Sequence, residues 1–225
     1  PAEADNGIRA LEVAPLIPTE WGQNQLYNQY CPEDLEGPAG YAYAGCVAVA
    51  MAQVMNYWQY PAEGFGSVSY SSLNYGIIEA DFSQAQYDWS SMANDEATEA
   101  NAELIYHCGV ATRVNYSPSN STTSTGFVAM ALPQYFGYVA GLDDMWRYNY
   151  DDESWKELIV DELIAGRPVV YRGQGGPGHC FLVDGVQNSD YFHINWGWNG
   201  SANGYFFLDD LTPGSGNFSN WQAMI

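Results

Sequence analysis

The chain has very few basic residues. Lysine and arginine together number six against 27 aspartates and glutamates, so the formal net charge is −21. A chain with this charge repels the phosphates of nucleic acids and of anionic lipids, which argues against nucleic-acid binding and simple attachment to a membrane surface. The acidic balance identifies no partner, and its plainest interpretation is solubility.

Long apolar runs are also missing. No stretch approaches the roughly 18 to 20 apolar residues of a membrane-spanning helix. No signal peptide is visible, and because the chain begins at Pro1 rather than Met, we expect a processed or shortened form. Its 225 residues, 47% of them hydrophobic, suffice for a proper core in one domain of two lobes or in two small fused domains.

Cysteine pairs of the CxxC kind are absent, so a zinc or redox motif is not expected, and we predict neither a metal nor a cofactor. The four cysteines are Cys31, Cys46, Cys108 and Cys180. If one of them is a working nucleophile, the other three allow at most one disulfide and one spare thiol. Cys108 falls in a helix-like apolar stretch and Cys180 in a strand-like one, so we predict both to be buried free thiols.

Helical patterns dominate the first part of the chain. After 40 irregular residues, apolar side chains recur at helical spacing from Cys46 to Trp58, and Pro61 ends the run. This helix is apolar on more than one face, so we expect it to be central and buried. Ser154 and Glu157 form a capping box that opens a later helix. The further helices are predicted over residues 94–107, 125–136 and 154–165.

The last part of the chain has the pattern of an antiparallel sheet. Strands are predicted over residues 169–171, 180–183, 191–195 and 205–208, separated by the glycine and Asn/Asp clusters that hairpins require. The predicted fold class is therefore α+β, with two lobes and a cleft between them. We expect a single domain over residues 1–225. Its helix-rich lobe is mainly 40–165, and its β-rich lobe is mainly 166–225 with parts of the N-terminal segment.

Cys46 is the cysteine best placed for chemistry. A thiol attacks well only as a thiolate, which requires a lowered pKa and a partner base. Cys46 follows Gly45 and opens the first predicted helix. A helix N-terminus favours negative charge and presents free N–H groups, which suit both a thiolate and an oxyanion. The plainer alternative is a small buried cysteine with a structural role.

His179 is the preferred base among only three histidines. It follows the glycine-rich segment 173–178, begins an apolar strand, and lies 133 residues after Cys46, within the roughly 130 to 150 of papain-like chains. Asn195 lies on the next predicted strand. We expect its amide oxygen to accept the imidazole N–H of His179 and to fix the orientation of the ring.

Two other histidines and one tryptophan need an interpretation. His193 is a rival base, because it lies two residues before Asn195 and faces the same side of a strand. His107 lies at a helix C-terminus and is interpreted as structural. Trp196 follows Asn195, and an indole over the His–Asn pair would exclude water and strengthen its hydrogen bond. An ordinary core tryptophan is the plainer alternative.

These segments resemble the streptopain family of bacterial cysteine peptidases, which belongs to the papain-like clan. The resemblance rests on GCVAVAMAQVM at 45–55, GHCFLVDG at 178–185 and HINWGW at 193–198. The Trp-Gly-Gln at 21–23 is similar to the family's N-terminal segment. Three motifs in the correct order span nearly the whole chain, which makes the resemblance specific.

The resemblance assigns a role to each candidate site residue. It implies Cys46 as nucleophile, His179 as general base, Asn195 as the residue that orients His179, Trp196 as their shield, and Gln23 as a side-chain donor of the oxyanion hole beside the backbone N–H of Cys46. The sequence departs from the papain signature Gly-Ser-Cys-Trp before and after Cys46. Cys180 stands where streptopain-like sequences often have alanine, so a second thiol is expected next to the base.

The resemblance also implies how such a protein works. It implies a bacterial endopeptidase, secreted or at the cell surface, that is made as a zymogen with an N-terminal propeptide and acts on proteins or peptides. An apolar residue would be preferred at the second position before the cut. The substrate cleft is expected to be lined by Ser119 and Ser121 in one loop and by Gly176 and Gly178 in another.

Other functions remain open from the sequence. A transglutaminase-like enzyme or a cell-wall amidase would use the same Cys–His acyl-transfer chemistry. A catalytically silent binding module that keeps the fold is a further alternative. The acidic pairs at 143–144 and 151–152 are interpreted as solvated surface rather than as calcium sites.

Overall fold

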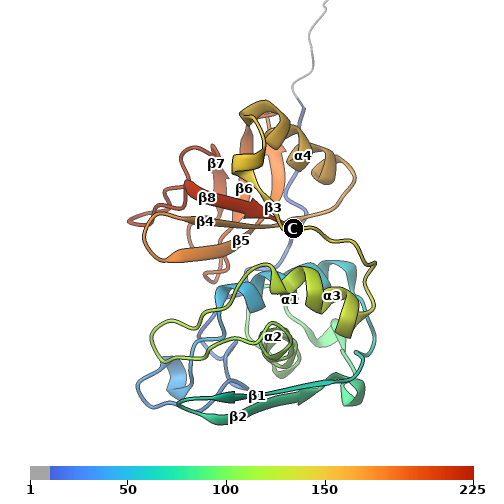
Figure 1. Ribbon diagram of the computed structural model, residues 1–225, viewed down its shortest axis with the longest axis vertical. Coiled ribbons are helices and arrows are strands. Elements are labelled where there is room, and N and C mark those ends of the chain that lie inside the picture. Colours follow the sequence, from blue (N-terminus) through green and yellow to red (C-terminus); the bar gives the residue numbers. More distant parts are fainter. Residues whose placement is uncertain (1–10) are drawn as a thin grey trace, which may run out of the picture.

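The computed structural model describes residues 11–225, which form two lobes (Figure 1). One lobe holds three helices and a hairpin: α1 (Cys46–Trp58), α2 (Glu99–Ala111), α3 (Phe127–Phe136), β1 (Ser67–Ser72) and β2 (Gly76–Asp81). The other lobe holds α4 (Asp152–Ile164) and a six-stranded sheet. Short 3₁₀ helices lie at η1 (Pro38–Gly40), η2 (Phe82–Gln84), η3 (Trp89–Ser91) and η4 (Arg147–Asn149). The predicted α+β class is confirmed.

The sheet is antiparallel, and its strand order is β3-β8-β4-β5-β6-β7. The strands are β3 (Met145–Trp146), β4 (Val169–Gln174), β5 (Gly178–Gln187), β6 (Tyr191–Asn195), β7 (Gly204–Phe206) and β8 (Asn220–Met224). β5 extends beyond the predicted 180–183 at both ends, because Gly178 and Gln187 still pair with the neighbouring strands. His179 therefore lies inside a strand. The sequence pattern missed β3 and β8.

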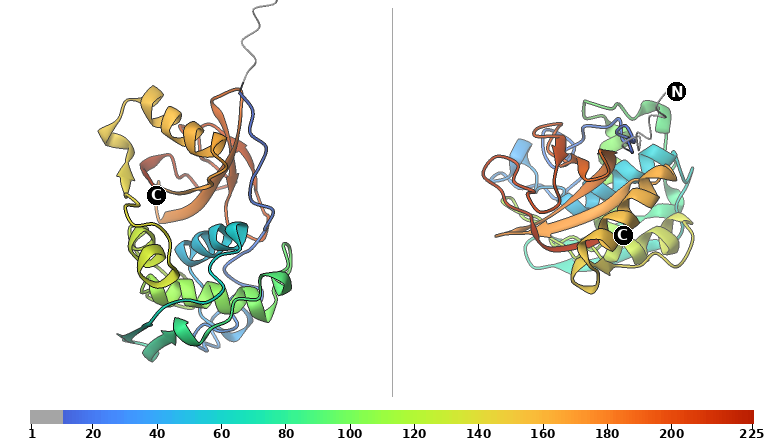
Figure 2. Two further views of the ribbon diagram at one scale, coloured as in Figure 1. Left: turned by 90° about the vertical axis from the view of Figure 1, so that its right-hand side faces the viewer. Right: turned by 90° about the horizontal axis from the view of Figure 1, so that it is seen from above.

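Helix α1 is the centre of the helical lobe and lies between α2 and the sheet (Figure 2). Every residue from 47 to 56 is buried. The predicted bounds are confirmed at both ends, where Gly45 precedes the helix and Gln59 leaves it in the left-handed conformation. Because α1 is enclosed on all sides, its first residue is held firmly at the junction of the two lobes.

Helix α2 begins at Glu99 rather than at residue 94, because Thr98 caps it. The Thr98 hydroxyl accepts the backbone N–H of Asn101, and the Asn101 side chain accepts the backbone N–H of Thr98. The helix runs past its predicted end at residue 107, so Gly109 lies inside it. A Cβ at Gly109 would collide with the hydroxyl of Tyr116, so the glycine serves close packing.

Helix α4 packs on the sheet and not on the helical lobe. Its buried residues Trp155, Ile159 and Leu163 belong to the same apolar core as the sheet face that includes Phe181. The predicted helix-rich range 40–165 therefore includes a helix that belongs to the other lobe. The predicted Ser154–Glu157 capping box is wrong, since the side chain of Asp151 caps α4 by accepting the N–H of Ser154.

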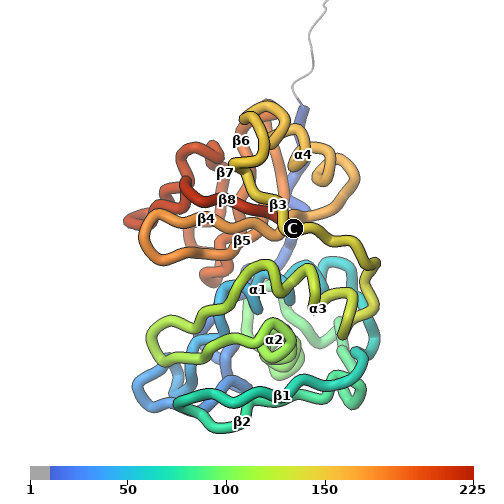
Figure 3. Tube along the Cα trace, viewed as in Figure 1, coloured from blue at the N-terminus to red at the C-terminus, as the bar shows by residue number. Residues whose placement is uncertain are grey.

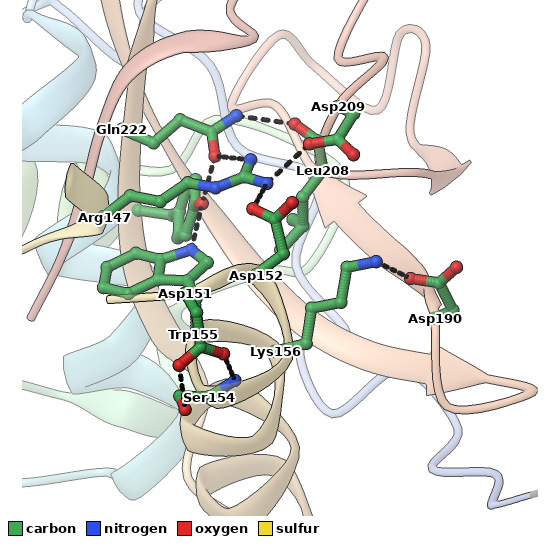
Figure 4. A network of polar contacts seen from close by, with 11 residues as sticks. Arg147, Asp151, Asp152, Ser154, Trp155, Lys156, Asp190, Leu208, Asp209 and Gln222 are labelled. Carbon is green, nitrogen blue, oxygen red and sulfur yellow. Dashed lines mark hydrogen bonds and ion pairs between the residues drawn. The ribbon is translucent and has the colours of Figure 1, made fainter. Parts of the chain in front are cut away.

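A polar network joins η4, α4 and the sheet (Figure 4). Arg147 donates to the amide oxygen of Gln222 at 2.7 Å and forms ion pairs with Asp152 and Asp209 at 2.7 and 2.6 Å. The hydroxyl of Tyr171 also donates to Gln222, at 2.7 Å. Since Gln222 is only 2% exposed, these contacts satisfy a polar group in the middle of the sheet lobe.

The N-terminal segment links the lobes, and Figure 3 shows it running beside the sheet before it enters the helical lobe. Val13 pairs with Val186 of β5, and the backbone N–H of Ile17 donates to the buried carboxylate of Asp184. All four cysteines are free. The prediction of buried free thiols at Cys108 and Cys180 is confirmed. Among the helices of residues 11–225, none is long and apolar enough to span a bilayer.

Candidate active site

Cys46 is the first residue of α1 and stays partly exposed at the lobe junction. Gly45 before it has φ 93° and ψ 136°, a conformation that side chains rarely adopt. A Cβ at Gly45 would meet its nearest neighbours at 3.5 Å, so the backbone conformation, and not lack of space, requires glycine here. The turn presents the Cys46 side chain and the first free N–H groups of the helix on the same side of the junction.

The thiol of Cys46 lies in a buried setting rich in backbone donors. Burial raises the pKa of the Cys46 thiol, and the backbone N–H groups of Cys180, Val47 and Cys46 itself act in the opposite direction. Cys180 therefore lies near the Cys46 side chain, and both pack at the core built around α1. Although Cys180 directly follows His179, no hydrogen bond joins the His179 ring to Cys46 in residues 11–225.

His179 is held by a backbone carbonyl. Its Nε2 lies 2.8 Å from the carbonyl oxygen of Trp196, and because a carbonyl can only accept, Nε2 carries the proton. The other ring nitrogen, Nδ1, then has a free lone pair and can take a proton from a thiol. Burial lowers the pKa of His179 to about 4, and the bond to Trp196 partly offsets this.

Aromatic rings enclose His179, which is only 8% exposed. Trp198 stacks on the imidazole with ring centroids 4.8 Å apart, and Phe218 lies at 5.2 Å. Phe181 and Trp196 lie at 5.9 and 6.3 Å. Trp196 was predicted as the shield of the base, but Trp198 makes the closer contact. The rings exclude water from the Nε2 hydrogen bond, which favours a single orientation of the base.

Asn195 does not contact His179. Its side-chain N–H donates to the carbonyl of Thr19 at 2.7 Å, and its oxygen accepts the backbone N–H of Gly197 at 3.1 Å. The predicted hydrogen bond from His179 to Asn195 is therefore absent, and the carbonyl of Trp196 takes its place. Asn195 holds the turn that carries this carbonyl, so it can orient the base only through the backbone.

Gln53 completes this arrangement and was missed from the sequence. It lies two turns after Cys46 on α1 and is 1% exposed. Its amide oxygen accepts from the hydroxyl of Thr19 at 2.8 Å and from the backbone N–H of Trp21, and its side chain also meets Asn195 at 3.3 Å. A buried glutamine among apolar helix residues was the available signal, because such a side chain needs partners.

Gln23 lies next to the nucleophile turn. Its carbonyl accepts the backbone N–H of Ala44 at 3.0 Å, which joins the segment containing Gln23 to the residues just before Cys46. Close packing fixes this segment, since a Cβ at Gly22 would collide with the side chain of Asn199. The backbone of Gln23 thus lies beside the turn that leads into Cys46.

The two predicted cleft loops belong to different lobes, one between α2 and α3 and the other between β4 and β5. The carbonyl of Ser121 is near Gly45, while its hydroxyl accepts the N–H of Ser117 at 2.9 Å and is used within the loop. Ser119 is exposed. Gly176 and Gly178 are exposed at the β4–β5 hairpin.

A segment near the C-terminus closes against the same hairpin. A Cβ at Gly173 would collide with the carbonyl of Phe218, and a Cβ at Gly175 with that of Asn217. The two glycines therefore allow the backbone of this segment to lie flat against β4 and place the ring of Phe218 beside His179. The glycine-rich sequence was predicted to border the cleft, but its contact with Asn217 and Phe218 was not.

The other two histidines have different surroundings. His193 bonds through Nδ1 to the buried carboxylate of Asp184 at 2.6 Å, and it packs edge-on against Tyr205. The structure thus brings the rival base to Asp184 rather than to the nucleophile. His107 is 8% exposed and meets the hydroxyl of Tyr87 at 3.0 Å, in agreement with a structural role. Within residues 11–225, no group of three or more His, Cys, Asp or Glu side chains is arranged to hold a metal ion.

Comparison with known proteins gives consistent results. Residues 21–206 match the model of the peptidase C10 family. Streptopain from Streptococcus pyogenes is 32% identical over 207 residues, which cover 82% of this chain and 52% of streptopain. The thiol protease/hemagglutinin PrtT of Porphyromonas gingivalis is 32% identical over 239 residues, covering 95% of this chain and 27% of PrtT. The chain thus spans about half the length of the streptopain sequences that it matches.

Solved structures extend the comparison to the fold. The structure of active wild-type interpain A, a cysteine protease of Prevotella intermedia, superposes with a TM-score of 0.85 at 36% identity, covering 95% of this chain and 93% of that one. A prointerpain A fragment gives a TM-score of 0.83 at 36% identity, covering 95% and 71%. The two-lobed architecture predicted from the sequence is therefore that of a known cysteine protease.

Proposed function

Because the chain belongs to the peptidase C10 family, we propose that it is a cysteine endopeptidase that hydrolyses peptide bonds through an acyl-enzyme on Cys46. His179 is the acid and base in this reaction. The substrates are proteins or peptides. The cleft loops that carry Ser119, Ser121, Gly176 and Gly178 bind the peptide on either side of the nucleophile.

One observation carries the proposal. Cys46 lies near Cys180, the residue that follows His179, while His179 donates through Nε2 to Trp196 and leaves Nδ1 free. Catalysis requires the ring of this base, held in one tautomer, to turn Nδ1 toward the sulfur. Burial favours the uncharged form of both groups in the free protein.

The reaction follows from these positions. Nδ1 of His179 takes the thiol proton, and the Cys46 sulfur attacks the scissile carbonyl carbon. The carbonyl oxygen gains negative charge and accepts hydrogen bonds from the backbone N–H of Cys46 and the side-chain amide of Gln23. The imidazolium gives its proton to the leaving amine. Water, deprotonated by His179, then attacks the thioester and releases the carboxylic acid and the thiol.

Secretion and activation are part of the same proposal. The protein acts outside a bacterial cell or at its surface and is made with an N-terminal propeptide. Support comes from the bacterial relatives and from the existence of a pro-form of interpain A. The expected consequence is a precursor without proteolytic activity, which gains casein hydrolysis when the propeptide is cleaved.

The test uses three single variants. Cys46→Ala and His179→Ala should each abolish casein hydrolysis and leave the far-UV circular dichroism spectrum unchanged. Cys108→Ala is the matched control, because Cys108 is a fully buried thiol that contacts the Met55 sulfur in the helical core. It should retain activity. Substantial residual hydrolysis by either site variant would contradict the assigned roles.

A labelling experiment separates catalysis from binding. Iodoacetamide at neutral pH should modify one thiol rapidly in the wild type and none at that rate in Cys46→Ala. Slow modification of Cys46 would favour a binding module. Cleavage of muropeptides in place of proteins, or incorporation of amines into glutamine, would move the same acyl-transfer chemistry to another substrate class.

A further inference from the structure

Arg172 differs from the other cations of this acidic chain. Of the five Lys and Arg residues within 11–225, Arg147, Lys156 and Arg167 form ion pairs with carboxylates. Arg113 and Arg172 have no carboxylate partner in this part of the chain. Arg113 is exposed, whereas Arg172 is half-buried. Since a partly buried charge without a partner is unfavourable, Arg172 needs an explanation that Arg113 does not.

Arg172 lies on the sheet face that meets the helical lobe. On β4 it pairs directly with Cys180 of β5, and side chains of opposite residues share one face. On that face, Val170, Cys180 and Leu182 belong to the core built around α1. The guanidinium of Arg172 lies over the ring of Trp146, 4.8 Å from its centroid. Stacking holds the plane of the guanidinium and leaves the N–H donors at its edge available.

Arg172 also lies in the neighbourhood of Cys46. Cys180, its direct partner on β5, belongs to the core against which Cys46 packs. Burial raises the pKa of both the Cys46 and the Cys180 thiols, and the charge of Arg172 is one of the influences that lower them. Arg172 thus lies one strand away from Cys180, on the sheet face that meets the lobe carrying Cys46.

We propose that Arg172 selects substrates with a carboxylate side chain within two residues of the bond that Cys46 attacks. This inference rests on the proposed peptidase function. Residues opposite each other on neighbouring strands are about 5 Å apart, and an extended peptide advances about 3.3 Å per residue. A side chain that meets Arg172 thus belongs to a substrate residue next to the scissile bond or one further away.

Aspartate or glutamate is the fitting side chain. A guanidinium presents parallel N–H donors that match the two oxygens of a carboxylate, and the half-buried position strengthens the bond. The selection differs from the apolar preference that the family resemblance implies at the second position before the cut. The net charge of −21 attracts basic partners at long range, so a preference for an acidic side chain at Arg172 is the opposite of what the overall charge favours.

The test compares pairs of peptides that differ only by Glu or Gln at one position. One pair is made for each position, from the third residue before the cut to the first residue after it. At one position, the wild type should cleave the Glu peptide about tenfold faster in kcat/KM than the Gln peptide. Arg172→Gln should bring this ratio near one, and Arg172→Glu should favour a Lys peptide. Arg113→Gln removes the same charge elsewhere and should keep the preference.

The outcomes are distinct. Cleavage of the neutral peptides without an acidic preference at any position would overturn the role of Arg172 and leave the peptidase function standing. An equal preference in Arg172→Gln and Arg113→Gln would also overturn it. No cleavage of any peptide by the wild type would refute the proposed function itself. If the Arg172 variants do not fold, the salt dependence of the wild type decides. An ion pair requires the preference for the Glu peptide to weaken when the salt concentration rises from 0.05 to 0.5 M, because the electrostatic screening length falls from roughly 14 to roughly 4 Å.

Discussion

Replacing His179 by glutamine should change how the stability of the protein depends on pH. Burial lowers the pKa of His179 to about 4 in the folded protein, against 6.5 for an exposed histidine. Between these values the unfolded chain binds a proton that the folded chain does not. Stability contributed by the neutral ring is therefore complete above pH 6.5 and is lost as the pH falls toward 4.

The magnitude follows from the difference in pKa. One pKa unit corresponds to about 1.4 kcal/mol, so the full window from pH 6.5 to 4 is worth about 3 kcal/mol. His179 is only 8% exposed, so solvent screening does not reduce this much. His107 has a pKa lowered to about 4 by burial as well, and it adds a second decline over the same window.

The assay is urea denaturation followed by tryptophan fluorescence in a Cys46→Ala background, which prevents self-cleavage and removes the charge of the thiol. The loss of unfolding free energy caused by His179→Gln should be smaller at pH 4.5 than at pH 7 by about 2 to 3 kcal/mol. This is about 1.4 kcal/mol for each of the two pH units over which the folded and unfolded chains differ in protonation. Ile159→Val is the control, because it removes a buried methyl group without a titrating one. Its cost, about 1 kcal/mol, should not change with pH.

The result that refutes this reasoning is a His179→Gln cost that is equal at pH 4.5 and pH 7. His179 would then be protonated in the folded protein across the window. Such a result would mean that the enclosure by Trp198 and Phe218 does not hold the imidazole neutral, and an NMR titration of the ring would place its pKa near 6.5.

Three further substitutions test the geometry around the site. Gly45→Ala should lower the free energy of unfolding by about 2 kcal/mol in urea denaturation, because φ 93° is strained for alanine; an unchanged stability would contradict this. Asn195→Ala should cost about 2 kcal/mol and lower kcat no more than about tenfold. A hundredfold loss of kcat at unchanged stability would instead indicate direct action on His179. Arg147→Met should cost 1 to 3 kcal/mol by thermal denaturation, roughly the cost of leaving Gln222 without one partner, and a neutral effect would contradict the network of Figure 4.

The sequence was sufficient for the helix that begins at Cys46, the proposed nucleophile. Apolar side chains at helical spacing between Gly45 and Pro61 predict α1 at its observed bounds, and the helix N-terminus identifies Cys46 among four cysteines. It was not sufficient for β8 (220–224), because the polar Gln222 is buried there and the apolar Trp221 is exposed, the reverse of what an alternating pattern predicts. Gln222 is satisfied by Arg147, 75 residues away, and such a partner leaves no local signal.

The error at Asn195 has a definite cause in the register of the sheet. Asn195 pairs with Leu182, three residues beyond His179 on β5. Leu182 packs in the core of the helical lobe, whereas His179 stacks on Phe181 of the other core. Because side chains alternate along a strand, Asn195 and the ring of His179 lie on opposite faces. The sequence predicts two neighbouring strands but not this register, which also shifts between Val183 and Gly185.

The carbonyl of Trp196, and not the side chain of Asn195, accepts the hydrogen bond from His179. This changes what the sequence must encode at the site. Any residue at position 196 supplies a carbonyl oxygen, so the orientation of His179 depends on where the turn after β6 lies. Asn195 fixes that turn to Thr19 and Gly197, and Gln53 joins it to the helix that carries Cys46. One buried amide pair, Gln53 and Asn195, thus connects the helix of Cys46 to the turn whose carbonyl holds His179, without a contact with the imidazole. Shortening Gln53 should therefore weaken catalysis in the same way as shortening Asn195, although neither side chain reaches the base.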